Sequence, residues 1–327
     1  MAQPDENLTP ESVHRTLRAS KERGDEYFAR KHKFHIFVEE LDGLNLRIST
    51  GQNMHFGIKF DKMRSKDEDD PPEGEVQFGF LRFKYYRESQ DTISIFCNHP
   101  TNVFSEVFDF YEAVFAIKLE KLTIYPRHIR NYVVFLTRFV ALKPYSLPIL
   151  SVRGTVLDPE EFKFILDSFN PTETADIWAM VPLGFAYDFH FTCGSVYLRN
   201  NGQWLTLDNL LNKRSQSLVA YRTSFGNRDI VEYLNRWAPR AFEGGYEIVT
   251  LELREPVDFG AIINGIQGCR LIAQGNHFST EKRHILFTDG RLVLLDVAQD
   301  TPQELTMLLY PQIPDNYGRE HGHMLLI

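Results

Sequence analysis

Apolar residues in the segment from Gly202 to Leu253 recur at two spacings, one typical of helices and the other typical of strands. After Asn227, four apolar residues follow one another at positions i, i+3, i+4 and i+7, which predicts a helix with one buried face. These residues are Ile230, Tyr233, Leu234 and Trp237. Asn227 is the predicted N-cap, and Asp229 places a carboxylate in the first turn, where the helix dipole favours negative charge.

The same segment contains a second, shorter unit, and a strand is predicted after each helix. Asp208 is predicted to cap the short helix, and the strand that follows it runs from Ser217 to Tyr221. After the longer helix, residues 246–253 alternate between apolar and polar types, as in a half-buried strand. A strand and a helix with one apolar face each cannot bury that face alone, so neighbouring units are expected to stack on it.

Five runs of alternating residues predict an antiparallel β meander between residues 34 and 100. The runs read FHIFVEEL, LNLRIS, MHFGIKF, VQFGFLRFKYY and TISIFC, and residues that favour turns separate them. The loop KDEDDPPEGE between the third and fourth runs is acidic and contains two prolines. It is interpreted as a solvated surface loop, and as a recognition loop it would suit a basic partner.

Helical and strand patterns alternate from residue 101 onward. Further helices are predicted over 103–117, 126–142, 158–169 and 257–266, and further strands over 119–125, 147–154 and 185–191. The strand centres recur at intervals of 28, 39, 29 and 31 residues when they are taken at Leu122, Leu150, Phe189, Leu218 and Val249. This spacing predicts an α/β fold, a curved solenoid of strand-helix units similar to a leucine-rich-repeat arc. A doubly wound nucleotide-binding sheet is not indicated, because the Gly-rich turn typical of that class is missing.

The C-terminal part carries a hairpin pattern. The sequence RHILFTDGRLVLLDV predicts two antiparallel strands joined at Asp289-Gly290, and the apolar strand LTMLLYP follows. The predicted organisation is a helical N-terminal segment (1–33), an antiparallel β-rich part (34–100), an α/β repeat core (101–270) and a C-terminal hairpin with its tail (271–327).

Composition and charge limit the classes of function. A chain of 327 residues with 43% hydrophobic residues can bury a large core. The net charge of -8 argues against a general nucleic-acid binder. The sequence has neither a signal peptide nor an apolar run long enough to span a membrane, and Cys97, Cys193 and Cys269 match neither a disulfide framework nor a zinc pattern. These features predict an intracellular protein, cytoplasmic or nuclear, without a nucleic-acid or membrane partner.

The sequence predicts no catalytic residues, no cofactor and no metal. It lacks a nucleotide-binding loop, H-E-x-x-H, G-x-S-x-G and the protein-kinase motifs. His321 and His323 lie in a Gly-rich tail without a third ligand nearby. Cys193 and Cys269 would each need an activating histidine to act as nucleophiles, and buried unreactive thiols are the usual case. An enzyme with an unfamiliar site between the β meander and the solenoid is the alternative from a different class.

Two blocks of the Gly202–Leu253 segment carry a resemblance to a known family. The segment resembles the type 2 F-box-associated domain of the large nematode set of F-box proteins. The family block W-x-T-L-x-x-L-L is matched by Trp204, Thr206, Leu207, Leu210 and Leu211. Its D-L-N-x-F-L-x-x-W helix is matched by Asp229, Leu234 and Trp237, with conservative replacements at Ile230 and Tyr233 and with Val231 in place of Asn. Both tryptophans are expected in the core, because each occupies an apolar position of its segment.

The resemblance extends from about Thr9 to Pro311 and includes part of an F-box. The sequence TPESVHRTLRASKERGDEYFARKHKF resembles the second half of a nematode F-box, with Ser20 and Lys21 as its Ser-Lys pair. An F-box also has an earlier helix, opened by a Leu-Pro element, that grips the ligase adaptor. This sequence begins too late to contain that helix, so the resemblance suggests a truncated F-box and leaves binding of the adaptor doubtful.

The resemblance implies a non-enzymatic protein-interaction module, similar to the substrate-recognition domain of an F-box protein in a cullin-RING ubiquitin ligase. The alternative within binding proteins is a decoy, inhibitor or antidote-like binder of one protein, without recruitment of a ligase. The contacts with the target protein are expected at exposed positions of the strands and their flanking loops, where Arg and Tyr are common at recognition surfaces. The candidate contact residues are Arg153, Tyr187, Arg199, Tyr221, Arg222 and Glu252.

Overall fold

The computed structural model describes a mixed α/β protein in two compact units, Met1–Gly154 (unit 1) and Thr155–Ile327 (unit 2). The described residues are 32–38, 44–50, 54–62, 71–78, 80–89, 92–115, 118–125, 147–154, 158–182, 184–188, 192–200, 202–238, 247–277, 280–312, 314 and 325–326. The strand pairings form one sheet within each unit. Residues 1–31 of the predicted N-terminal helical segment, the 126–142 helix and the paired histidines of the tail lie outside the described residues, and the last two residues of that segment, His32 and Lys33, are in a strand.

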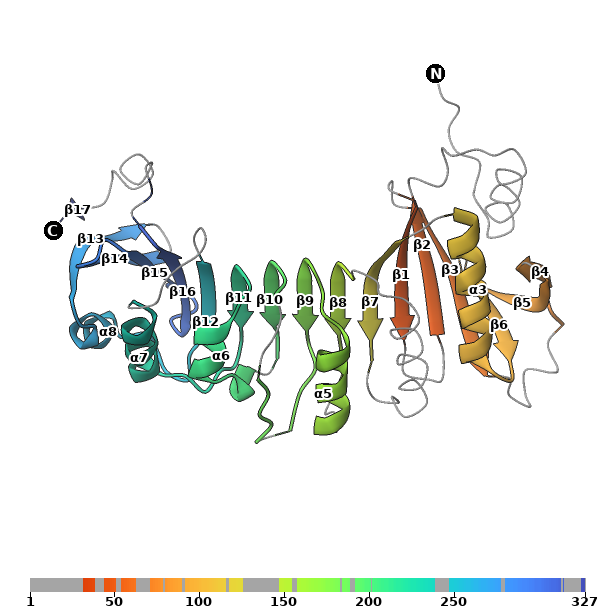
Figure 1. Cartoon of the computed structure of the whole chain (residues 1–327), viewed down its shortest axis with the longest axis horizontal. Coiled ribbons are helices and arrows are strands. Elements are labelled where there is room, and N and C mark those ends of the chain that lie inside the picture. The colour runs from red at the N-terminus through yellow and green to blue at the C-terminus, as the bar shows by residue number, and fades with distance from the viewer. Residues whose placement is uncertain are drawn as a thin grey trace, which may run out of the picture. The chain divides into compact units, whose positions relative to one another are not determined.

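The sheet of unit 1 has the strand order β4-β5-β6-β3-β2-β1-β7-β8. Its elements are β1 (His32–Val38), β2 (Leu44–Thr50), β3 (Met54–Lys62), β4 (Gly74–Phe78), β5 (Leu81–Ser89), β6 (Thr92–Cys97), helix α3 (Pro100–Phe115), β7 (Lys118–Ile124) and β8 (Ile149–Val152). Helix α3 packs on β2, β3 and β6 (Figure 1). Phe104, Val107, Phe108 and Tyr111 of this helix are buried, and the Phe104 ring meets the Phe60 ring edge-on at 5.5 Å.

Two details of the predicted meander are wrong. The run VQFGFLRFKYY forms two strands rather than one, because β4 and β5 pair as a hairpin in which Phe78 lies opposite Leu81. The meander is also not purely antiparallel, since β6 pairs with β3 in parallel. The β4–β5 hairpin lies between β3 and β6 in the sequence, and the start of β6 pairs with Gly57 within β3.

The sheet of unit 2 has the strand order β9-β10-β11-β12-β16-β15-β14-β13-β17. The strands are β9 (Thr174–Ile177), β10 (Ser195–Leu198), β11 (Ser217–Ala220), β12 (Glu247–Glu252), β13 (Cys269–His277), β14 (Thr280–Phe287), β15 (Leu292–Ala298), β16 (Glu304–Tyr310) and β17 (Leu325–Leu326). From β9 to β12 the strands are parallel, and all later pairings are antiparallel. The predicted turn at Asp289-Gly290 joins β14 to β15 and is confirmed.

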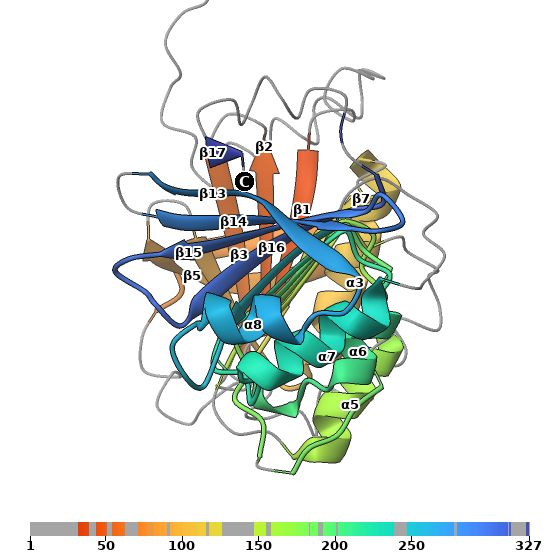
Figure 2. The same cartoon turned by 90° about the vertical axis from the view of Figure 1, so that its left-hand side faces the viewer.

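The helices of unit 2 gather on one side of its sheet (Figure 2). They are α5 (Pro159–Ser168), the 3₁₀ turn η2 (Gly202–Trp204), α6 (Leu207–Asn212), α7 (Asn227–Trp237) and α8 (Phe259–Gly265). The strand residues that face the helices are apolar, aligned in register and buried: Ala175, Val196, Leu218 and Val249 form one row, and Ile177, Leu198, Ala220 and Leu251 form the next. No helix among the described residues is long and apolar enough to cross a membrane.

The solenoid predicted from strand spacing is not confirmed. The predicted strand FAYDFHF is wrong in its described part, because residues 185–188 are not in a strand. The structure instead has β9 and β10 before and after this segment. The connection between β9 and β10 contains no helix in the portion that the structure describes. This repeat therefore lacks the helix expected of a strand-helix solenoid. Beyond β12 the parallel order ends, since the next strand is the antiparallel β16.

The predicted helix that contains Trp237 is confirmed. The N-cap residues predicted for this helix and for the shorter helix α6 are both wrong. The four apolar residues of α7 are buried, but Asn227 is the first helical residue and Gly226 is the N-cap. Asp229 lies in the first turn as predicted, and its Oδ2 accepts a hydrogen bond of 2.7 Å from the N–H of Gly226. In α6 the cap is Thr206 rather than Asp208.

Replacing Thr206 by alanine is expected to destabilise unit 2 by about 1 kcal/mol. The Thr206 hydroxyl accepts from the N–H of Asn209 at 3.1 Å, and the Asn209 side chain accepts from the N–H of Thr206 at 3.0 Å, so one substitution opens a reciprocal cap. Chemical denaturation of the variant measures the loss. Thr206→Ser keeps the hydroxyl and is expected to retain most of the stability, so equal losses in both variants would contradict the role of the cap.

Candidate functional site

The face of the parallel sheet opposite the helices carries polar and aromatic side chains. Because neighbouring residues of a strand point to opposite faces, the residues between the buried ones share this second face. Asp176, Tyr197, Val219 and Thr250 are partners in register across β9, β10, β11 and β12. The first three are half-buried rather than enclosed, so this face of the sheet is accessible along β9, β10 and β11.

A second row lies one step nearer the carboxyl ends of the same strands. Two backbone hydrogen bonds continue the parallel pattern past the strands, from the N–H of Arg199 to Ile177 O and from the N–H of Tyr221 to Leu198 O. Alternation places the row on the accessible face. We call it the edge row, and it consists of Trp178, Arg199, Tyr221 and Glu252.

Trp178 is the centre of a set of polar and aromatic contacts at this edge. Its Nε1–H donates to Asp176 Oδ2 at 2.9 Å, and its carbonyl oxygen accepts from Asn200 Nδ2 at 2.9 Å. Arg199 Nε donates to the other oxygen of the same carboxylate at 3.1 Å. The Arg199 guanidinium lies 4.5 Å from the centroid of the Tyr197 ring and 5.5 Å from that of Trp178. These five residues form what we call the Trp178 cluster.

The Trp178 cluster holds its side chains in place while leaving them accessible. Trp178 is 38% exposed, and it is one of two exposed large hydrophobic residues in the described parts of the chain, the other being Phe80 of unit 1. The Arg199 side chain is 33% exposed. Ion pairs this accessible add little to stability, but an arginine fixed between a carboxylate and two aromatic rings loses little side-chain entropy on binding. Trp, Tyr and Arg are also the residues most enriched at interface hot spots.

The edge continues beyond β11 with an unusual backbone conformation at Arg222. Its φ of 55° lies in the left-handed region and is the only positive φ of a non-glycine residue among the described residues. Glu252 holds this turn, because its Oε2 accepts from the N–H of Arg222 at 2.9 Å while its carbonyl oxygen accepts from the Thr223 hydroxyl at 2.7 Å. Strained backbone of this kind persists where surrounding contacts fix it, and it often occurs at functional sites.

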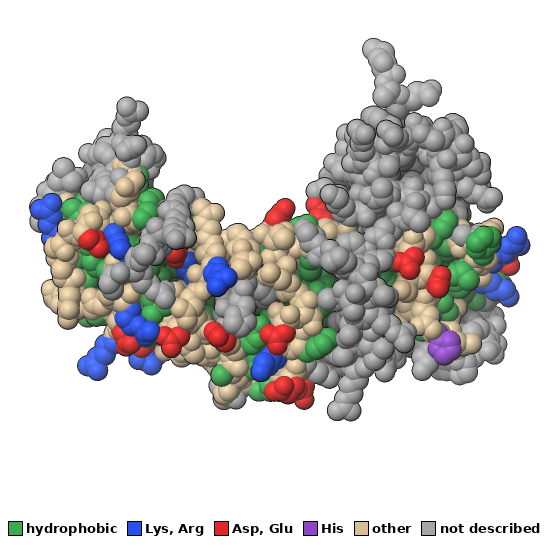
Figure 3. Space-filling view, in the orientation of Figure 1, with side chains coloured by type: hydrophobic (Ala, Val, Ile, Leu, Met, Phe, Trp, Pro, Cys, Tyr) green, Lys and Arg blue, Asp and Glu red, His purple; other side chains and the backbone are tan. Residues whose placement is uncertain are grey.

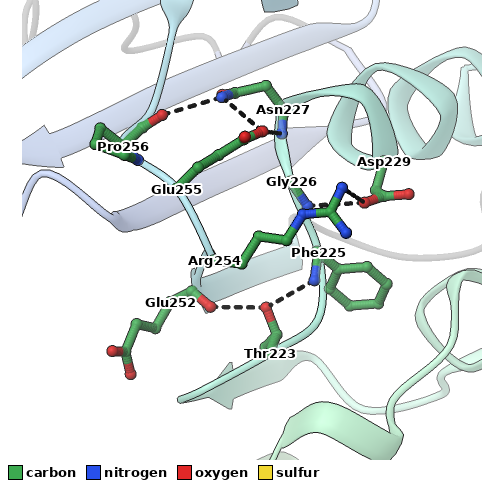
Figure 4. A network of polar contacts seen from close by, with 9 residues as sticks. All are labelled: Thr223, Phe225, Gly226, Asn227, Asp229, Glu252, Arg254, Glu255 and Pro256. Carbon is green, nitrogen blue, oxygen red and sulfur yellow. Dashed lines mark hydrogen bonds and ion pairs between the residues drawn. The ribbon is translucent and has the colours of Figure 1, made fainter.

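A network of hydrogen bonds ties this edge to the start of α7 (Figure 4). Asn227 Nδ2 donates to Glu255 Oε1 at 3.1 Å and to Pro256 O at 3.0 Å, and Asn227 Oδ1 accepts from the N–H of Asp258 at 2.8 Å. Glu255 Oε1 also accepts from the N–H of Asn227 at 2.7 Å. The loop after β11 and the loop after β12 are therefore joined side chain to backbone, which keeps the edge row on a rigid support.

The structure brings together four of the six contact residues predicted from the sequence. Arg199, Tyr221 and Glu252 belong to the edge row, and Arg222 adjoins it. Tyr187 instead lies among the side chains beneath the helices. It is 7% exposed, its ring meets Trp204 edge-on at 6.2 Å, and its hydroxyl donates to Asp167 at 2.8 Å. Burial raises the pKa of the Tyr187 phenol, with Asp167 adding to the effect. The expected exposure of Tyr187 is therefore wrong.

Arg153 lies in unit 1, directly after β8. Its Nε donates to Ser151 Oγ at 3.2 Å, and its N–H donates to Ile124 O at 2.8 Å. It therefore belongs to a different unit from the residues of the edge row. Trp204 and Trp237 are 6% and 3% exposed, which confirms that they are core residues.

Sequence reasoning missed Trp178 and Asp176. Both belong to β9 or follow it directly, and this strand was not predicted. Two features of the sequence could have pointed to them. The run TADIW alternates polar and apolar residues over a short strand length, and the tryptophan at its end falls on the polar phase.

The helical side of unit 2 carries charges of both signs (Figure 3). Arg236 on α7 pairs with Glu232 one turn earlier and with Asp208 on α6, all at exposed positions. Such alternating charges are typical of a solvated helical surface. The helical side is therefore a weaker candidate for specific recognition than the edge row.

One ion pair of unit 2 is buried and serves the fold. The Lys213 side chain is 1% exposed, and its ammonium contacts Glu247 at the start of β12 and donates to Ser215 O at 3.1 Å. Burial lowers the pKa of Lys213, and Glu247 acts in the opposite direction. The pair joins the end of α6 to β12, and the Lys213 side chain is buried, so we assign the pair a structural role.

The groups expected for catalysis or metal binding do not converge in the described residues. These contain no group of three or more His, Cys, Asp or Glu side chains that could hold a metal ion. The three thiols are unpaired, and burial raises the pKa of each. Cys193 Sγ contacts the carbonyl oxygen of Ser195 at 3.3 Å, which favours the protonated thiol rather than a nucleophile.

Cys97 is expected to react with iodoacetamide at pH 8 roughly 100-fold more slowly in the folded protein than after unfolding in urea. Burial raises its pKa to about 11, so the thiolate that attacks the reagent is scarce at this pH. Peptide mapping by mass spectrometry gives the rate for each cysteine, and the unfolded chain is the control. Fast alkylation of Cys97 or Cys193 in the folded protein would contradict the conclusion that these buried thiols are unreactive.

The edge row and the Trp178 cluster thus form a rigid, accessible surface of aromatic and charged side chains on the face of the sheet opposite the helices. Comparison of the chain with protein-family models, with curated proteins and with solved structures finds no match.

Proposed function

We propose that unit 2 is a protein-binding module and that the edge row is its contact surface. The observation that carries this proposal is the Trp178 cluster, in which one carboxylate holds an exposed tryptophan and a half-buried arginine. Fixed aromatic and Arg side chains bind other proteins at low entropic cost. The residues of the Trp178 cluster lie on β9 and β10 or directly after these strands, and not on a long loop. Binding sites on strands hold their side chains more precisely than sites on loops do.

The resemblance to F-box-associated domains supports the same role. By that resemblance, the bound protein would be a target presented to a cullin-RING ubiquitin ligase, and the parallel strands would act as a leucine-rich-repeat-like arc. A decoy or antidote-like inhibitor would use the same surface without a ligase. For the enzyme alternative, the described residues contain no group of three or more His, Cys, Asp or Glu side chains that could hold a metal ion.

Affinity capture from cells with the full chain tests the proposal. We expect Trp178→Ala to lose a partner that the wild-type chain retains, because the substitution removes the exposed ring from the edge row. Phe80→Ala is the matched control, since Phe80 is an exposed aromatic residue of unit 1. Equal partner recovery with the wild type and Trp178→Ala, or an equal loss with Phe80→Ala, would contradict the proposal.

The proteins recovered with the partner distinguish the two binding roles. Ligase adaptor and cullin in the captured complex would support target recognition for ubiquitination. One stable partner without those proteins would support the inhibitor role. Either result keeps the edge row as the contact surface provided that Trp178→Ala abolishes capture.

A further inference from the structure

Four charged residues share the accessible face of β9, β10, β12 and β16, and their charges do not balance. Asp176, Arg199 and Glu252 lie on this face, and Glu304 joins them because it lies directly opposite Glu252 in the β12–β16 ladder. The base among them, Arg199, is paired with Asp176 at 3.1 Å. Glu252 and Glu304 are left as two carboxylates without a cation partner among the described residues.

Two arginines close to Glu252 in the chain do not neutralise it. Arg254 lies 3.8 Å from Asp229 at the start of α7, and Figure 4 shows the Glu252 carboxylate pointing away from Arg254. Arg222 offers Glu252 only its backbone N–H, which donates to Oε2 at 2.9 Å. Strand alternation after Tyr221 turns the Arg222 side chain toward the opposite face. The hydrogen bond therefore holds an uncompensated carboxylate at the end of β11, next to Tyr221.

The two glutamates approach each other across the ladder. Antiparallel pairs alternate between two types, so Glu252 and Glu304 form the same type of pair as Thr250 and Thr306, two residues away on the same face. The two threonine hydroxyls are 3.0 Å apart, which shows how closely side chains meet in this part of the sheet. Like charges directly opposite each other destabilise a sheet. A cation supplied by another molecule would remove that repulsion.

We propose that Glu252 and Glu304 bind an Arg or Lys side chain of the partner, while an apolar residue of the same segment lies on Trp178. The inference rests on the proposed function and names the chemistry of the partner segment. Tyr221, the neighbour of Glu252 in the edge row, adds an aromatic ring that favours a cation. The net charge of -8 also attracts a basic partner to the whole chain.

The strand order sets the distance between the two contacts. Trp178 follows β9, and Glu252 and Glu304 lie three and four strands away from it. Adjacent strands lie about 4.8 Å apart, so the contacts are roughly 14–19 Å apart. An extended segment advances about 3.3 Å per residue. The apolar and the basic residue of the partner are therefore expected to be about four to six positions apart.

Peptide pools with a fixed leucine and one test residue five positions before or after it test the proposal with the full chain. The test residue is Arg, Lys or Gln, the other positions are randomised, and binding is measured by fluorescence anisotropy at low salt. We expect the Arg pool or the Lys pool to bind roughly tenfold or more tightly than the Gln pool.

Two variants show whether the glutamate pair is responsible. Glu304→Gln is expected to remove most of the preference for basic pools without lowering the urea denaturation midpoint, because it ends the repulsion with Glu252. Glu160→Gln is the matched control, since it removes an exposed carboxylate from α5 on the helical side, and it is expected to leave the preference intact.

The outcomes separate this proposal from the proposed function. A preference for only one basic pool supports the site and identifies its cation. Equal binding of all three pools, absence of binding to any pool, or a similar loss with Glu160→Gln overturns the cation site. A lower denaturation midpoint of Glu304→Gln overturns it as well, because the carboxylate would then serve the fold. If Trp178→Ala abolishes capture of a cellular partner while Glu304→Gln does not weaken it, the contact surface stands and the cation site fails.

Discussion

Replacing Trp237 by alanine is expected to lower the free energy of unfolding of unit 2 by about 3–5 kcal/mol. The Trp237 ring is 3% exposed and meets the Phe287 ring edge-on at 6.2 Å, so it joins α7 to β14. The Arg291 guanidinium lies 5.7 Å from the ring centroid and donates to the carbonyl oxygen of Trp237 at 3.2 Å. Alanine removes the ring and leaves a cavity at the junction of these elements.

Thermal unfolding measures this loss, and a fall in Tm of roughly 6–20 °C is expected for a unit of this size. Trp178→Ala is the matched control, because it removes the same side chain from a position that is 38% exposed. It is expected to cost less than about 1 kcal/mol. We therefore expect Trp237→Ala to reduce mainly stability and Trp178→Ala to reduce mainly partner binding. A larger loss of stability for Trp178→Ala than for Trp237→Ala would contradict the assignment of core and surface.

Replacing Asn227 by alanine is expected to destabilise unit 2 by about 2–4 kcal/mol. Its side chain donates to Glu255 and to Pro256 O, and it accepts from the N–H of Asp258. Hydrogen bonds of this kind contribute about 0.5–1.5 kcal/mol each, and more when one partner is charged. The three bonds join α7 to the loop before α8, so faster hydrogen exchange of amides in both helices is expected as well.

Two substitutions show whether these bonds are responsible. Asn264→Ala removes the same side chain from an exposed position of α8 and is expected to change stability by less than about 0.5 kcal/mol. Asn227→Asp keeps an acceptor for Asp258 N–H but places a carboxylate beside Glu255, so it is expected to destabilise as well. Unchanged denaturation midpoints for Asn227→Ala and Asn227→Asp would show that the network is dispensable.

The sequence was most informative where a long pattern and a tertiary contact agree. The face of α7 was predicted residue by residue, because eleven residues carry three turns of consistent apolar spacing. The Asp289-Gly290 turn was also predictable, since Gly290 has a φ of 89° that glycine adopts readily. The N-caps Gly226 and Thr206 were missed because Asn227 and Asp208, which lie one and two residues further along the chain, are also residue types that favour the N-cap position.

Short strands and loops account for most of what the sequence could not show. Strands β9 and β10 have four residues each, of which only two are buried, so their pattern is too brief to recognise. Phe185 and Tyr187 imitate a strand by alternation, but they point into the core from an irregular segment and contact Trp204. Missing β9 also removed Asp176 and Trp178 from the candidate site. Arg199, Tyr221 and Glu252 were recognised as candidates, but nothing in the sequence indicated that they share one row.

The pairing of β12 with β16 has a consequence for how the protein is made. Thr250 and Thr306 share a hydrogen bond of 3.0 Å, although 56 residues separate them in the chain. During synthesis, the edge of β12 that faces β11 can form its backbone hydrogen bonds as soon as β12 has left the ribosome. The opposite edge of β12 can form its hydrogen bonds only after β16 has been synthesised. A nascent chain that ends between β12 and β16 exposes unpaired backbone N–H and C=O groups of β12 next to Val249 and Leu251. We therefore expect chaperones to bind nascent chains of this length.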